Sequence, residues 1–131
     1  MVIDGSAIVA FLRGEREADR IEALLDDAPA CHISAYTVVE CRALLLARFG
    51  EDMLREFDKL IERAGMVIRP FDRVQSTLAF NAYRRFGRSC GHPAQLTLAD
   101  CAAYALARSL DLPLLYIGKD FALTDVEAAL V

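Results

Sequence analysis

Four acidic residues carry the strongest chemical signal in this sequence. Asp4 directly follows an apolar run at residues 1–3, and Asp120 follows residues 114–117 after a Gly-Lys step. Glu40 and Asp100 each lie within a strongly apolar stretch. An unpaired carboxylate buried there would face a desolvation penalty of several kcal/mol, so it must be neutral, hydrogen-bonded or bound to a cation.

If these four side chains lie close together, they indicate a site for divalent cations. Two carboxylates about 4 Å apart repel each other by roughly 4 kcal/mol at an effective dielectric of about 20, so a group of four needs shifted pKa values or divalent cations. A ligand set of carboxylates without a matching histidine suits Mg²⁺ or Mn²⁺ and disfavours zinc. Ions held in this way serve phosphate chemistry, because they activate water and neutralise charge on phosphoryl oxygens.

Each acid also has a purely structural explanation, which the sequence leaves open. Asp4 and Asp120 would each suit the N-cap or first turn of a following helix. Glu40 and Asp100 each follow a threonine by three residues, which is the spacing of a capping box. A capping acid can lie in water, however, so capping does not account for apolar surroundings.

The elements that must position these acids alternate between short apolar strands and helices. Strands are expected at residues 1–3, 31–33, 66–68 and 114–117, helices at 6–12, 15–25, 36–49, 51–64, 71–86 and 97–110, and a loop at 87–95. Parallel strands need crossover connections, so this order predicts an α/β fold with a mainly parallel sheet. Ligands bind beyond the carboxyl ends of such strands, where the four acids are expected to meet.

Composition limits the class of protein. The chain has 131 residues, a net charge of −4 and 55% hydrophobic residues, which predicts one folded domain over residues 1–131 and excludes disorder. No apolar run approaches the roughly 20 residues of a membrane span, and the first residues do not resemble a secretion signal. The four cysteines form no CxxC pair, so we expect reduced thiols in a cytoplasmic protein.

The motifs around the acids are similar to those of a known family. They read VIDGSA at residues 2–7, SAYTVVE at 34–40, LADCAAYALA at 98–107 and IGKDF at 117–121. With these motifs the whole chain resembles the PIN-domain ribonucleases, specifically VapC-type toxins of bacterial type II toxin–antitoxin pairs. The resemblance implies a PIN-like α/β/α sandwich, a single PIN domain whose short-stranded, mainly parallel sheet is flanked by helices.

The resemblance also implies roles for individual residues. Asp4, Glu40, Asp100 and Asp120 correspond to the acidic quartet that binds Mg²⁺ or Mn²⁺ and cuts RNA, and Ser6 matches a hydroxyl residue near the first acid.

Two positions depart from the family pattern. Thr97 stands where many relatives carry Asn, and Lys119 stands where many relatives carry Asn or Asp. Lys119 would either weaken a second metal position or contact the scissile phosphate. Asp125 is an additional candidate ligand, ranked below Asp120.

A basic cluster lies beside the loop, formed by Arg84, Arg85 and Arg88. These side chains would either bind the phosphates of an RNA backbone or offset the dipole at a helix C-terminus.

The expected function is therefore a Mg²⁺-dependent endoribonuclease toxin that a cognate antitoxin neutralises. The alternative is a catalytically silent PIN-like module that acts by binding RNA or protein. The family and the apolar excess of residues 36–60, including residues 44–46, also predict a homodimer. No membrane association is expected.

Overall fold

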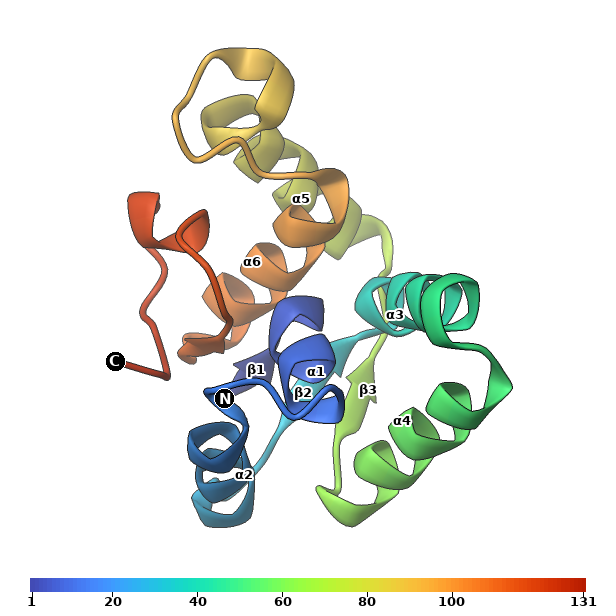
Figure 1. The fold of residues 1–131 in the computed structure, drawn as a ribbon. Coiled ribbons are helices and arrows are strands. Elements are labelled where there is room, and N and C mark those ends of the chain that lie inside the picture. Colours follow the sequence, from blue (N-terminus) through green and yellow to red (C-terminus); the bar gives the residue numbers. More distant parts are fainter.

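Four short parallel strands form the centre of the structure, a computed structural model that describes residues 1–131 (Figure 1). The strands are β1 (Val2–Ile3), β2 (His32–Ser34), β3 (Val67–Arg69) and β4 (Leu114–Leu115). Their order across the sheet is β3-β2-β1-β4, and each pairing is parallel. The predicted mainly parallel sheet is therefore confirmed.

Helices connect successive strands. They are α1 (Gly5–Leu12), α2 (Ala18–Asp27), α3 (Ala35–Phe49), α4 (Glu51–Arg63), α5 (Arg73–Phe86) and α6 (Leu98–Leu110), with short 3₁₀ turns η1 (Arg88–Cys90) and η2 (Phe121–Leu123). None of these helices combines the length and apolar character needed to cross a membrane.

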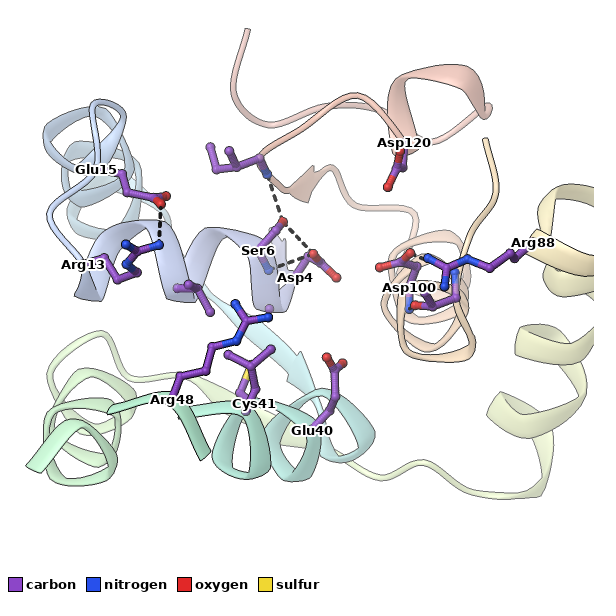
Figure 2. Close-up of a pocket in the computed structure, with 15 residues that line it drawn as sticks. Asp4, Ser6, Arg13, Glu15, Glu40, Cys41, Arg48, Arg88, Asp100 and Asp120 are labelled. Carbon is purple, nitrogen blue, oxygen red and sulfur yellow. Dashed lines mark hydrogen bonds and ion pairs between the residues drawn. The ribbon is translucent and has the colours of Figure 1, made fainter. Parts of the chain in front are cut away.

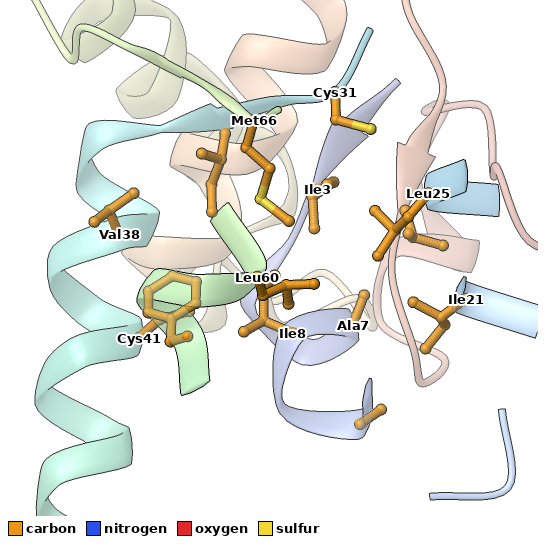
Figure 3. Packing of buried hydrophobic residues seen from close by; sticks show 14 of the residues in the cluster. Ile3, Ala7, Ile8, Ile21, Leu25, Cys31, Val38, Cys41, Leu60 and Met66 are labelled. Carbon is orange, nitrogen blue, oxygen red and sulfur yellow. The ribbon is translucent and has the colours of Figure 1, made fainter. Parts of the chain in front are cut away.

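The sheet separates two hydrophobic cores. Ile3 and Leu115 pack on one face with residues from α1, α2, α3 and α4 (Figure 3), whereas Val2 and Leu114 pack on the other face with residues from α5 and α6. Successive strand residues point to opposite faces, so two adjacent apolar residues supply both cores. This arrangement is the expected α/β/α sandwich.

The observed boundaries differ from the expected ones for local reasons. Strand β4 ends at Leu115 rather than residue 117, because the amide of Ile117 donates to the hydroxyl of Ser6 at 3.0 Å. Helix α2 begins at Ala18 rather than residue 15, because the backbone first makes a turn in which Ala18 donates to the carbonyl of Glu15 at 2.9 Å.

Gly5 permits the close approach of α1 to α3. A Cβ atom at this position would lie 3.0 Å from Sγ of Cys41, closer than side chains normally pack. The small residue therefore brings the start of α1 against the helix that carries Glu40. Since Asp4 precedes Gly5, this contact helps to place two of the predicted acids near each other.

Candidate active site

All four predicted acids line one cavity of about 490 Å³ at the carboxyl ends of the strands (Figure 2). Asp4 follows β1, Glu40 lies in α3 beyond β2, Asp120 lies beyond β4, and Asp100 lies in the first turn of α6. We call this space the carboxylate cavity. It gathers acids from four parts of the chain at the place where parallel α/β folds bind ligands.

Asp4 is buried and held in one orientation. One of its oxygens, Oδ2, accepts from the amide of Ser6 at 3.0 Å and from the Ser6 hydroxyl at 2.6 Å. Asp4 is only 5% exposed, and this burial raises the pKa of its carboxyl group to about 6 although the bonds from Ser6 oppose the shift. The negative charges of Asp100 and Glu40 raise the pKa further. Asp4 thus caps α1 with one oxygen and leaves Oδ1 without a protein donor.

Asp100 forms the capping box that the spacing suggested. Its Oδ2 accepts from the amide of Thr97 at 2.9 Å, while the Thr97 hydroxyl accepts from the amide of Asp100 at 3.2 Å. Burial raises the pKa of Asp100 and so does the charge of Asp120, whereas the bonds from Thr97 and the charge of Arg88 lower it. Because capping uses a single oxygen, it is compatible with a ligand role for the other.

Glu40 does not form a capping box, so that explanation is wrong for this residue. Helix α3 begins at Ala35, and its cap is Ser34, whose hydroxyl accepts from the amide of Tyr36 at 3.2 Å. The side chain of Glu40 accepts no hydrogen bond and forms no ion pair in the structure, and burial, followed by the charge of Asp100, raises its pKa. Its carboxylate is free to bind a ligand in the cavity.

Asp120 is also without a side-chain partner. It occupies the N-cap position of η2, but its carboxylate makes no capping hydrogen bond. The preceding Gly118 has a φ of +105°, a conformation that glycine adopts readily and that turns the chain between β4 and Asp120. The expected capping role is therefore not fulfilled by the side chain, which faces the carboxylate cavity (Figure 2).

The donor set fits a hard divalent cation. The predicted ligands are all carboxylates, and burial together with mutual repulsion makes three of them resist ionisation in the absence of a cation. In the arrangement that the structure shows, no three His, Cys, Asp or Glu side chains lie close enough together to hold a metal ion. The residues that would hold the ion are Asp4, Glu40, Asp100 and Asp120, in an open arrangement.

The residues predicted to bind substrate divide into two groups. Ser6 and Arg88 line the carboxylate cavity, whereas Arg84, Arg85 and Lys119 do not.

The two arginines outside the cavity have other contacts. Arg84 lies over the ring of Phe80, with 5.7 Å between its Cζ and the ring centre, and Arg85 forms an ion pair with Asp125 at 3.5 Å. Asp125 itself accepts from the hydroxyl of Tyr104 and does not line the carboxylate cavity.

Sequence reasoning missed two arginines of the cavity, Arg13 and Arg48. A signal for Arg48 was available, since Cys41, Leu44 and Arg48 follow one another at spacings of three and four residues and so share a face of α3. Arg13 had no such signal, because it belongs to the turn that ends α1.

Comparisons with known proteins identify the family of the chain. The PIN domain family matches residues 1–127. Ribonuclease VapC28 from Mycobacterium tuberculosis is 42% identical over 130 residues, covering 99% of this chain and 98% of the relative. Ribonuclease VapC from Mycolicibacterium smegmatis is 41% identical over 128 residues and covers 98% of both chains.

Solved structures share the fold. The crystal structure of Mycobacterium tuberculosis VapC20, described as a sarcin-ricin loop cleaving toxin, superposes with a TM-score of 0.81 at 14% identity, covering 99% of this chain and 98% of that one. A toxin–antitoxin complex from Klebsiella pneumoniae superposes with a TM-score of 0.66 at 20% identity, covering 92% and 89%. The family match and the close relatives together show that this chain belongs to the PIN-domain family and, within it, to the VapC ribonucleases.

Proposed function

We propose that this protein is a Mg²⁺-dependent endoribonuclease in which Asp4, Glu40, Asp100 and Asp120 form the catalytic and metal-binding site. The observation that carries the proposal is the convergence of these four carboxylates on one cavity without cationic partners within ion-pair distance. Mn²⁺ would suit the same oxygen ligands.

The protein side chains divide the work. Asp4 and Asp100 are each oriented by hydrogen bonds at one oxygen, so they present the other oxygen as fixed ligands. Glu40 and Asp120 have no such bonds and are suited to orient an attacking water or accept its proton. When bound, Mg²⁺ activates water and neutralises charge that develops on the phosphate.

A cleavage assay tests this function. Purified protein is incubated with cellular RNA in Mg²⁺, in Mn²⁺ and after addition of a chelator, beside an Asp4→Asn variant. The expected result is internal cleavage that depends on the divalent ion and on Asp4. RNA binding without cleavage in any metal would instead support the silent PIN-like module.

We further propose that the protein is a toxin with an antitoxin partner, because the chain is related to VapC ribonucleases and because one structure with the same fold is a toxin–antitoxin complex. RNA as the substrate implies that the protein acts in the cytoplasm. Expression of the protein should arrest growth, and expression of the cognate antitoxin should restore it. Growth unaffected by the active ribonuclease would contradict the toxin role.

We also propose that the protein forms a homodimer. In the predicted apolar segment Leu45 is buried, but Leu46 is 47% exposed and Val39 on the same helix is 63% exposed. A dimer would cover part of this surface. Light scattering should give the mass of two chains for the wild type and of one chain for a charged substitution at Leu46, whereas a monomeric wild type would contradict the dimer.

A further inference from the structure

Arg48 lines the carboxylate cavity, and its positive charge has no role in the metal site proposed above. The cavity lining contains five acids and three arginines. Figure 2 shows Arg88 next to Asp100 on one side of Asp4 and Arg48 on the other side. Asp4 therefore lies between two positively charged groups.

Arg48 differs from its neighbour Arg13 in being free of a carboxylate partner. Arg13 pairs with Glu15 at 3.4 Å and lies over the ring of Phe49, with 5.6 Å between its Cζ and the ring centre. Arg48 takes part in none of the ion pairs of the structure. Its guanidinium has donors that remain available to an anion entering the cavity.

We propose that Arg48 binds a backbone phosphate of the RNA next to the phosphate that is cut, on the side of the acids opposite Arg88. This inference rests on the proposed ribonuclease function and adds a substrate-positioning residue to it. An RNA strand that crosses the cavity places several phosphates near the acids, and those outside the metal site need other cations. Arginine is suited to this role because its planar donors match two phosphate oxygens.

A structural role for Arg48 makes different predictions. If its charge only offset the repulsion among the carboxylates, its removal would change stability or metal affinity but leave phosphate contacts unaltered. A phosphate contact instead contributes to the dependence of RNA affinity on salt. Each contact with a single strand contributes a slope of about −0.7 to the logarithmic plot of affinity against salt.

The test measures binding of a labelled single-stranded oligoribonucleotide as a function of salt, in Mg²⁺, with Asp4→Asn in every protein to prevent cleavage. Arg48→Ala should weaken binding about tenfold and reduce the slope by about 0.7, whereas Arg48→Lys should keep the slope. Arg55→Ala is the matched control, because Arg55 is an exposed arginine of α4 outside the cavity. It should change neither quantity.

Cleavage kinetics with Asp4 intact provide the second readout. Arg48→Ala should raise KM about tenfold and change kcat by less than about threefold, since the contact positions substrate away from the reacting atoms. An unaltered KM and salt slope would overturn the role of Arg48 even if the wild type cuts RNA. If the wild type does not cut RNA in Mg²⁺, the proposed function fails, and the salt slope still decides whether Arg48 contacts phosphate.

Discussion

Two groups of charged side chains in this molecule shift the pKa values of their acids in opposite directions. In the carboxylate cavity, burial raises the pKa of Asp4 to about 6. Between α6 and the C-terminal segment, the hydroxyl of Tyr104 first, and then Arg108 and Arg85, hold the pKa of Asp125 below its ordinary value. We call this second group the Asp125 cluster.

The difference separates an acid whose charge is stabilised by partners in the protein from acids whose charge has no such partner. Asp125 has partners in the protein that stabilise its negative charge, so its ionised form favours the folded state. Asp4 and Glu40 lack cationic partners at ion-pair distance, so their ionised forms oppose folding as long as no cation compensates their charge. Carboxylates with pKa values raised in this way cluster at functional sites.

The largest expected effect separates the two regions by activity. Asp4→Asn should reduce RNA cleavage about a thousandfold, since it removes several kcal/mol of transition-state stabilisation that depends on the bound ion. Asp125→Asn should change cleavage by less than about threefold. Single-turnover cleavage rates measure the effect of each substitution. Equal losses of cleavage in the two variants would show that the active centre is not confined to the carboxylate cavity.

In the absence of metal, the stability of the folded protein should depend on pH through Asp4. The pKa of Asp4 is about 6 in the folded protein, whereas its ordinary value is 3.8. Between these two pH values the folded protein therefore binds more protons than the unfolded chain does. The free energy of unfolding should therefore fall by up to about 3 kcal/mol as the pH rises from 4 to 7.

Asp4→Asn should remove this fall and stabilise the metal-free protein at pH 7, as measured by urea unfolding. Asp125 acts in the opposite direction, because its pKa is lowered and its contribution is lost as the pH decreases below its ordinary pKa. A wild type whose stability does not decline above pH 4 would contradict the pKa assigned to Asp4.

Loss of the Ser6 hydroxyl, which orients Asp4, should reduce cleavage less than loss of the Asp4 carboxylate does. Ser6→Ala removes the hydroxyl that donates to Asp4 and accepts from Ile117, and should reduce metal affinity or cleavage by about 10- to 100-fold. The control is Ser76→Ala, whose hydroxyl donates only to the carbonyl of Arg73 in its own helix at 2.8 Å. If both variants cut RNA equally well, Ser6 does not position Asp4 for catalysis.

The smallest effect distinguishes capping from catalysis at Asp100. Thr97→Ala removes the capping hydroxyl and should lower the free energy of unfolding by about 1 kcal/mol. Cleavage should change by less than about tenfold, because the amide of residue 97 still donates to Asp100. Thr77→Ala, whose exposed hydroxyl donates within α5, is the control for unfolding measured in urea. A larger loss of cleavage would give Thr97 a direct part in the site.

Much of the fold was predictable because its signals are local. Short apolar strands at fixed positions and helix-ending glycines such as Gly50 are written in neighbouring residues. The C-terminal end of β4 was not predictable, because a side chain distant in sequence, Ser6, binds the amide of Ile117. The N-terminal end of α2 was not predictable, because a backbone turn precedes Ala18.

The candidate site was predictable to a similar degree. Acids directly after strands, or in apolar helices, were visible in the sequence, and the structure places all four in one cavity. The basic residues were harder to place, because their directions depend on tertiary contacts. Arg85 is held by Asp125 and Arg84 lies over an aromatic ring, while Arg48, which sequence reasoning did not select, reaches the cavity.

The central claim is that Asp4, Glu40, Asp100 and Asp120 bind one or more divalent cations in the carboxylate cavity. Crystals grown in Mn²⁺ and measured at the manganese absorption edge test it most directly. We expect an anomalous peak within the cavity, with Asp4 and Asp100 oxygens coordinating the ion. Manganese bound only elsewhere, with these carboxylates turned toward solvent, would contradict it.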